Sequence, residues 1–193
     1  PKGAVVSWFE DGKPVAAEAK AVVVATPKYI ARHLVECLPE AQSKAMAAMR
    51  YAPYLMVNLC FDRAVWSRAY DTYPIGARYL ADFIPADFVR VGRNGKPDRK
   101  QVITVFVPLD GSERESLLDD AAVLARAEAA CAEFCSLVPD SEPHLREVRV
   151  FRRGHAMPMT TVGFVTRLQP AASADFSPIF FGASDSEGEI SDL

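Results

Sequence analysis

The most informative stretch for the fold lies close to the end of the chain and reads Ser177-Pro-Ile-Phe-Phe-Gly-Ala-Ser-Asp185. It is apolar on both faces before it turns through small residues to a carboxylate. A strand of that kind belongs inside a sheet that helices cover on both sides. Small residues at the carboxyl end of such a strand let the backbone approach a ligand, and an acid there can hold a sugar hydroxyl. This stretch therefore predicts a buried strand of an α/β sheet.

Both ends of the sequence resemble positions inside a longer fold. A helix would be expected after Asp185, but only eight residues follow it, up to Leu193. At the other end, Pro1-Lys2-Gly3 leads directly into a strand pattern without a signal peptide. We therefore expect the chain to be a fragment.

Composition limits the class of protein. The chain has 193 residues, of which 50% are hydrophobic and 24% charged, as in ordinary globular proteins. Its net charge of -3 gives no electrostatic basis for binding nucleic acid or an anionic membrane surface. It has no apolar run approaching the ~20 residues that span a bilayer. We expect a cytoplasmic protein without a membrane span.

The four cysteines do not form a metal-binding CxxC pair, and we expect no metal site. Cys131 and Cys135 are four residues apart, which can place two thiolates on one helix face. They also belong to an apolar stripe at helical spacing: Leu117, Ala121, Leu124, Ala127, Cys131, Cys135 and Val138. The stripe favours reduced cysteines buried in a core.

Strand and helix patterns follow one another along the chain. Residues 4–9 and 15–19 predict a hairpin around an Asp-Gly turn, residues 21–25 a buried strand, and residues 28–37 and 40–49 two helices. The following elements are predicted strands at 54–61, 79–91 and 101–109, a helix at 115–138, a strand at 145–151, an irregular segment at 154–169 and the closing strand. The basic connection 92–100 is either a phosphate-gripping loop or a solvated hairpin tip.

Hydrolase and nucleotide-binding motifs are absent from the sequence. The three histidines are far apart, and there is no Gly-x-Ser-x-Gly, HExxH, GxGxxG or Walker sequence. His33 and His144 are expected to be solvent-facing or hydrogen-bonded structural residues. His155 lies in the irregular segment and is either structural or catalytic. A hydrolase would need it beside a serine or cysteine nucleophile.

An ordered set of weak signals resembles the flavin-containing amine oxidase superfamily, which also holds protoporphyrinogen oxidases and carotenoid desaturases. The signals are the hairpin, Ala21-Val-Val-Val-Ala-Thr-Pro27, Leu38-Pro39, Met56-Val-Asn-Leu-Cys-Phe61 with Trp66, Ala156-Met-Pro158 with Gly163, and Ile179-Phe-Phe-Gly-Ala-Ser-Asp185. The resemblance implies an α/β to α+β protein. Residues 1–46 and 172–193 would be incomplete pieces of a Rossmann-like FAD domain, and residues 47–171 a mixed-sheet substrate domain with helices.

The resemblance also implies site residues. Ala25, Thr26 and Pro27 match the strand end that passes near the cofactor. Asp185, preceded by Gly182, Ala183 and Ser184, matches the acid that binds the ribityl or pyrophosphate part of FAD. The family more often has Ala-Gly where this chain has Gly182-Ala183, which displaces the closest approach by one residue. The alternative for Asp185 is a turn or helix-cap acid.

Two departures from the family concern the substrate. Met56 falls where the amine oxidases carry a lysine near the flavin, and the residues after Asp185 include no aromatic. Met56, His155, Met157 and Met159 are candidate substrate-lining residues, and no catalytic residue is assigned.

The resemblance leads to an expected function. The parent protein would pass a hydride from an apolar or amine-like small molecule to FAD. The fragment alone would be inactive and would bind FAD poorly. The alternative is a non-enzymatic binding or assembly module that keeps the substrate-domain fold without cofactor and forms a homodimer through exposed sheet edges.

Overall fold

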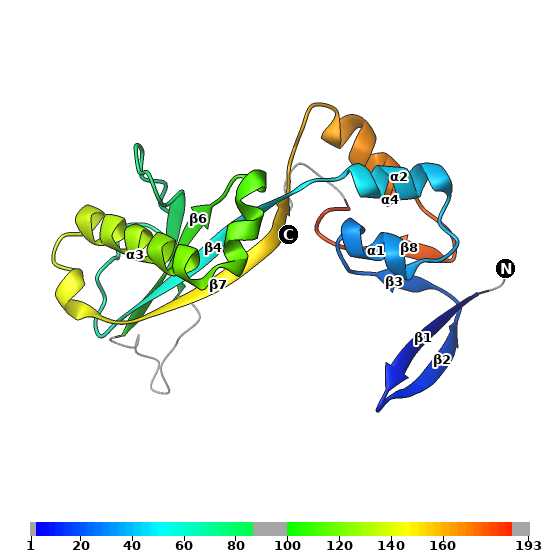
Figure 1. Ribbon diagram of the computed structural model, residues 1–193, viewed down its shortest axis with the longest axis horizontal. Coiled ribbons are helices and arrows are strands. Elements are labelled where there is room, and N and C mark those ends of the chain that lie inside the picture. The colour runs from blue at the N-terminus through cyan, green and yellow to red at the C-terminus, as the bar shows by residue number, and fades with distance from the viewer. Residues whose placement is uncertain (1–2, 87–99, 187–193) are drawn as a thin grey trace. The chain divides into compact units, whose positions relative to one another are not determined.

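The chain folds as two compact units, and the computed structural model describes residues 3–86 and 100–186 (Figure 1). Unit 1 comprises residues 1–50 and 157–193, and unit 2 comprises residues 51–156. The predicted FAD and substrate segments divide at residues 46 and 171, whereas the compact units divide at residues 50 and 156. Residues 157–173 belong to unit 1 because the helices of residues 164–173 pack against the helix Glu40–Ala48. The assignment of the units to FAD and substrate domains stays a prediction.

Unit 1 begins with the predicted hairpin. Strands β1 (Ala4–Glu10) and β2 (Lys13–Ala19) pair antiparallel in the register Glu10↔Lys13. Asp11 and Gly12 both adopt positive φ, 50° and 75°, the backbone that a tight two-residue hairpin turn requires. The Asp-Gly turn predicted from the sequence is therefore confirmed.

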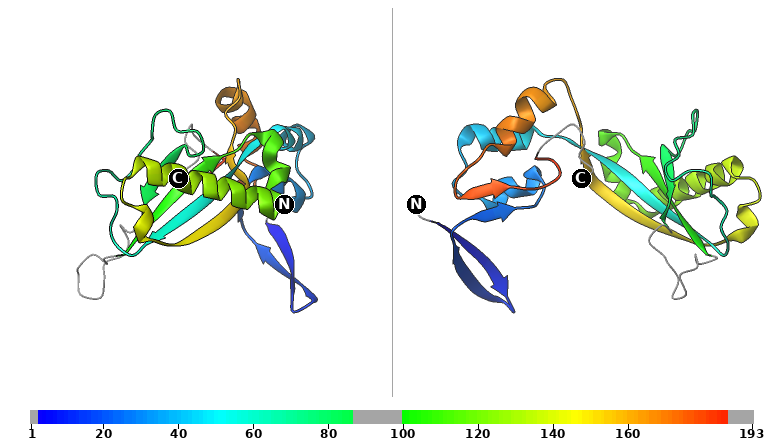
Figure 2. Two further views of the ribbon diagram at one scale, coloured as in Figure 1. Left: turned by 60° about the vertical axis from the view of Figure 1, so that its left-hand side comes forward. Right: turned by 180° about the vertical axis from the view of Figure 1, so that it is seen from behind.

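The rest of unit 1 is a parallel strand pair with short helices. β3 (Val22–Val24) pairs with β8 (Ile179–Phe181), which comes from the other end of the chain, and the right view in Figure 2 shows these strands side by side. The helices are α1 (Lys28–Leu34), α2 (Glu40–Ala48), the π-helical turn η4 (Phe164–Leu168) and α4 (Gln169–Ser173). Helix α1 ends three residues earlier than predicted because Val35 is already extended, with φ −101° and ψ 103°.

Unit 2 is built on a four-stranded sheet in the order β5-β6-β4-β7. Its strands are β4 (Tyr51–Phe61), β5 (Asp82–Pro85), β6 (Gln101–Pro108) and β7 (Leu145–Pro158). β6 pairs antiparallel with both β4 and β5. Burial alternates strictly along β4, so that one face is a core face and the other is partly open.

Helix α3 (Asp120–Leu137) covers the core face of this sheet, and short 3-10 turns η2 (Gly111–Leu118) and η3 (Glu142–His144) flank it (Figure 2). The predicted helix 115–138 is therefore broken at Asp119, whose extended backbone separates η2 from α3 and whose side chain caps α3. The buried face of α3 also differs from the predicted stripe. It consists of Val123, Ala127, Ala130 and Phe134, which pack on Leu55, Val57 and Leu59 of β4.

Two further segments differ from the prediction. The expected strand 79–91 contains only β5 within the described residues, because the backbone N–H groups of Arg78, Tyr79 and Leu80 donate to the carboxylate of Glu133 on α3 instead of a sheet partner. The expected irregular segment 154–169 begins as the end of β7 and finishes with η4 and the first residue of α4.

The predicted connection 92–100 lies outside the described residues, except for Lys100. In the described part of the chain, no helix has the length and apolar character needed to cross a membrane.

Candidate functional site

The carboxyl ends of β3 and β8 bring the two predicted cofactor segments together. The strands are in register from Val22↔Ile179 to Val24↔Phe181, and the N–H of Gly182 donates to the carbonyl oxygen of Val24 over 3.0 Å. Residues 25–27 and 182–185, which include every predicted cofactor residue, therefore leave the same edge of the sheet. The carboxyl edge of parallel strands is where α/β proteins place ligands.

Asp185 and Lys28 form a buried ion pair at this edge. The side chains of Lys28 and Asp185 are 0% and 2% exposed, and Lys28 Nζ lies 2.9 Å from Asp185 Oδ1. The backbone N–H of Lys28 donates to Oδ2 over 2.7 Å, so the carboxylate also caps the start of α1. Lys28 Nζ donates a second bond to Ser186 Oγ and lies 5.5 Å from the ring centroid of Phe181. Asp185 thus takes the helix-capping role that was the alternative prediction for it.

A flavin nucleotide fits this edge only in part. The hydroxyl Oγ1 of Thr26 is buried and has no hydrogen-bond partner among the described residues, so it is available to a ligand. The carboxylate of Asp185, however, is held by Lys28 and shielded from solvent. A Cβ on Gly182 would meet Val23 Cγ1 at 3.0 Å, so this glycine serves strand packing. The chain also contains no GxGxxG to bind a pyrophosphate. The described residues at this edge therefore do not by themselves form a complete flavin site.

The partly open face of the unit 2 sheet carries Met56. Residues directly opposite in antiparallel strands share a face, and Met56 pairs with Phe106, which pairs in turn with Asp82. The ring centroid of Phe106 lies 5.8 Å from that of Tyr54. One row along, Thr104 Oγ1 donates to Asn58 Oδ1 over 2.9 Å. This face combines apolar, aromatic and polar side chains, as small-molecule sites do.

Among the other predicted lining residues, His155 belongs to unit 2 together with Met56. The ring centroid of His155 lies 6.1 Å from that of Tyr51, on the side of β4 away from Met56. Partial burial and the nearby charge of Arg114 lower the pKa of His155. Met157 and Met159 belong to unit 1, where the N–H of Met159 donates to the carbonyl oxygen of Arg50.

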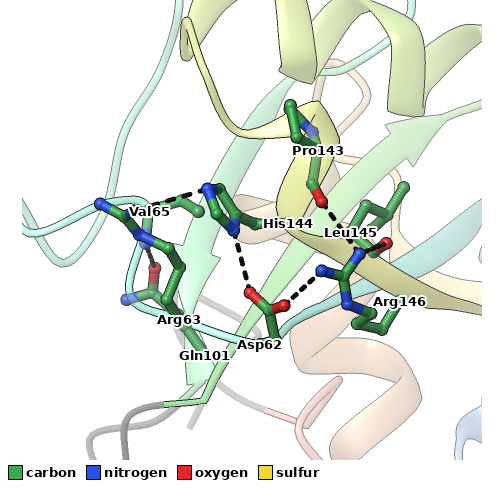
Figure 3. A network of polar contacts seen from close by, with 8 residues as sticks. All are labelled: Asp62, Arg63, Val65, Gln101, Pro143, His144, Leu145 and Arg146. Carbon is green, nitrogen blue, oxygen red and sulfur yellow. Dashed lines mark hydrogen bonds and ion pairs between the residues drawn. The ribbon is translucent and has the colours of Figure 1, made fainter.

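Sequence reasoning did not predict the polar network around Asp62 in unit 2 (Figure 3). His144 Nδ1 lies 3.0 Å from Asp62 Oδ1, Arg146 pairs with Asp62 Oδ2, and Arg63 lies 3.5 Å from His144 Nε2. Burial raises the pKa of Asp62, but the hydrogen bonds and charges of Arg146 and His144 lower it overall.

This network has a structural role. Because the guanidinium of Arg63 can only donate, its contact with His144 Nε2 favours the neutral tautomer that carries its proton on Nδ1, toward Asp62. Arg63 stands where a nucleophile would have to be, and the N–H of Asp62 also donates to the carbonyl oxygen of His144 over 3.0 Å. The cluster joins the end of β4 to the start of β7. It could have been suspected from the charged residues that follow β4 and those at the start of β7.

Within the described residues, no group of three or more His, Cys, Asp or Glu side chains is arranged to hold a metal ion. All four cysteines are free.

The chain belongs to the flavin containing amine oxidoreductase family, whose pattern matches residues 1–189. Its fold is similar to part of a putrescine oxidase solved with bound putrescine, with 16% identity and a TM-score of 0.68 over 96% of this chain. It is also similar to cyclohexylamine oxidase from Brevibacterium oxydans IH-35A, with 10% identity and a TM-score of 0.61 over 96% of this chain. An oxidoreductase from Methanosarcina mazei matches 98% of the chain at 12% identity and a TM-score of 0.65.

The chain spans less than half the length of these structures, namely 41%, 40% and 45% respectively. A comparison with curated proteins gives no match. The family match therefore shows the flavin-containing family, and the likeness to solved structures shows the fold alone.

Proposed function

We propose that this chain is the substrate-domain-bearing part of an FAD-dependent oxidoreductase that oxidises an apolar or amine-like small molecule. The observation that carries the proposal is the pairing of β3 with β8, because it unites residues from the two ends of the chain at one sheet edge in a member of a flavin-containing family. In such a protein the flavin accepts the hydride, and the polypeptide binds and orients the substrate.

The residues of this chain have two parts in that function. At the strand edge, Thr26 supplies a buried hydroxyl that is available to a ligand, and the ion pair of Asp185 with Lys28 fixes the start of α1 beside it. In unit 2, Met56 and Phe106 form part of an apolar floor on the open sheet face. The phosphate-binding glycines must come from residues outside this chain, so the chain by itself would be inactive.

Reading the coding sequence upstream of Pro1 tests this proposal. We expect a strand followed by GxGxxG, with an acidic residue about 20 positions further on. The complete polypeptide should then purify with the visible absorption of oxidised flavin, and a primary amine or an apolar substrate should bleach it without oxygen. A stop codon or an unrelated domain upstream would contradict the proposal.

A second candidate is a non-enzymatic assembly module that forms a homodimer. It is favoured by the β1–β2 hairpin, where Val5 and Phe9 are 68% and 78% exposed. Sedimentation equilibrium should show a dimer that Phe9→Glu converts to a monomer. The matched control is Ile75→Glu in unit 2, at a fully exposed position, which should leave the dimer intact. A wild-type monomer at all concentrations would exclude this candidate.

A further inference from the structure

Unit 2 contains an apolar groove between α3 and β7 that is separate from the strand edge in unit 1. Its volume is about 550 Å³. The walls include Leu124, Cys131 and Cys135 from α3 and Leu145 and Val148 from β7. A volume of this size lies in the range of small-molecule sites, about 300 to 1,000 Å³.

The groove explains why the apolar stripe of α3 is wider than its buried face. Residues 123, 127, 130 and 134 pack into the core, whereas Leu124 is 56% exposed and the two cysteines are only partly buried. Across the groove, Val148 is 41% exposed. Apolar side chains that line a concave surface without a partner indicate a binding surface.

The charges at the groove have one sign. Glu128 and Glu142 line it, and no lysine or arginine does so in the described part of the chain. The nearby arginines are engaged elsewhere, since Arg146 pairs with Asp62 and Arg149 with Glu147. The negative charge of Glu142 is felt by Cys131 in the wall of the groove. Burial, the Cys135 thiol and this charge together raise the pKa of Cys131 to about 11.

We propose that this groove binds a small organic cation with an apolar body, whose ammonium group lies between Glu128 and Glu142. The hydrocarbon part would cover Leu124, Val148 and the two cysteines. The site lies on the helix-covered side of the sheet, opposite the face that carries Met56, so it is distinct from the proposed substrate floor. The proposal does not depend on flavin chemistry.

Alkyl compounds of equal length but different charge test the proposal on the 193-residue chain. The probes are octylammonium, octanol and octanoate, and the readouts are calorimetric affinity and the rate of maleimide labelling of each cysteine by peptide mass spectrometry. Octylammonium should bind several-fold more tightly than octanol and at least tenfold more tightly than octanoate. It should slow the labelling of Cys131 and Cys135, but not of the exposed Cys37.

Charge variants make the test specific to this groove. Glu128→Gln and Glu142→Gln should each weaken octylammonium several-fold and leave octanol unchanged. The control Glu147→Gln removes a carboxylate of β7 that already binds Arg149 and should have no effect. Equal affinity for the three probes, or labelling of Cys131 and Cys135 that octylammonium does not slow, would overturn the proposal. Binding of a basic amphipathic peptide without binding of octylammonium would also overturn it.

Discussion

Replacing Lys28 by methionine should destabilise unit 1 by about 3 to 5 kcal/mol, because the carboxylate of Asp185 would remain buried without its ammonium partner. At 2.9 Å, the attraction between the two charges is about 6 kcal/mol for an effective dielectric constant of about 20. Methionine keeps the apolar length of the side chain and the backbone N–H that donates to Asp185 Oδ2. We therefore expect a loss near the lower end of the range.

Two further variants separate the ion pair from other effects. In Lys28→Met with Asp185→Asn both charges are absent, so most of the lost stability should return. The surface pair of Lys44 and Glu40 is the matched control. Its atoms lie 2.6 Å apart, closer than in the buried pair, but the side chains are 74% and 82% exposed. Lys44→Met should therefore cost only about 0 to 1 kcal/mol.

Hydrogen exchange is the appropriate assay because the chain has two units that can open separately. The change in exchange free energy is measured for amides of β3 and α1 in unit 1 and for amides of β4 in unit 2. Lys28→Met should accelerate exchange in unit 1 alone. A loss below about 1 kcal/mol, or a double variant no more stable than Lys28→Met, would refute the reasoning that burial makes this pair important.

Two other predictions concern unit 2. Burial raises the pKa of Glu133, but the backbone hydrogen bonds from residues 78–80 lower it overall below its usual 4.5. The stability it contributes is therefore present above about pH 4.5 and lost as the pH falls through the folded-state pKa. Glu133→Ala should cost about 1 to 3 kcal/mol in urea denaturation at pH 7 and little at pH 3, whereas Glu128→Ala on the same helix should cost little at either pH. An equal loss at both pH values would contradict this role for Glu133. For the thiols, burial raises the pKa of Cys131 to about 11, so at pH 8 a maleimide should label the exposed Cys37 well before Cys131, as peptide mass spectrometry can show. Equal labelling rates would contradict the burial of Cys131.

Local patterns predicted the elements of the fold where sequence neighbours determine the structure. The Asp11-Gly12 turn, the alternation along β4 and the short apolar strand β8 are all visible in the sequence. The break at Asp119 was missed because apolar residues continue on both sides of it. Residues 78–80 were predicted as strand because nothing local shows that Glu133, more than fifty positions later, takes their N–H groups.

Of the candidate site, only the residues that follow the two strands could be predicted from the sequence. The small residues and the acid after β8 indicated residues 182–185, and family resemblance added residues 25–27. Lys28 was missed because a lysine at the start of a helix usually lies in water. Its burial depends on Asp185, which lies 157 positions away in the sequence. Contacts between residues so far apart in the sequence depend on the tertiary fold, and the periodic pattern of apolar residues does not reveal them.

Titrating the purified 193-residue chain with FAD tests the central claim most directly, namely that the flavin chemistry of this family requires residues outside this chain. The fluorescence of FAD is followed as protein is added. We predict no saturable quenching, because the chain has no phosphate-binding glycine sequence and Lys28 already holds the carboxylate of Asp185. Tight, stoichiometric quenching that Asp185→Asn abolishes would contradict the account and show that this chain holds a complete flavin site.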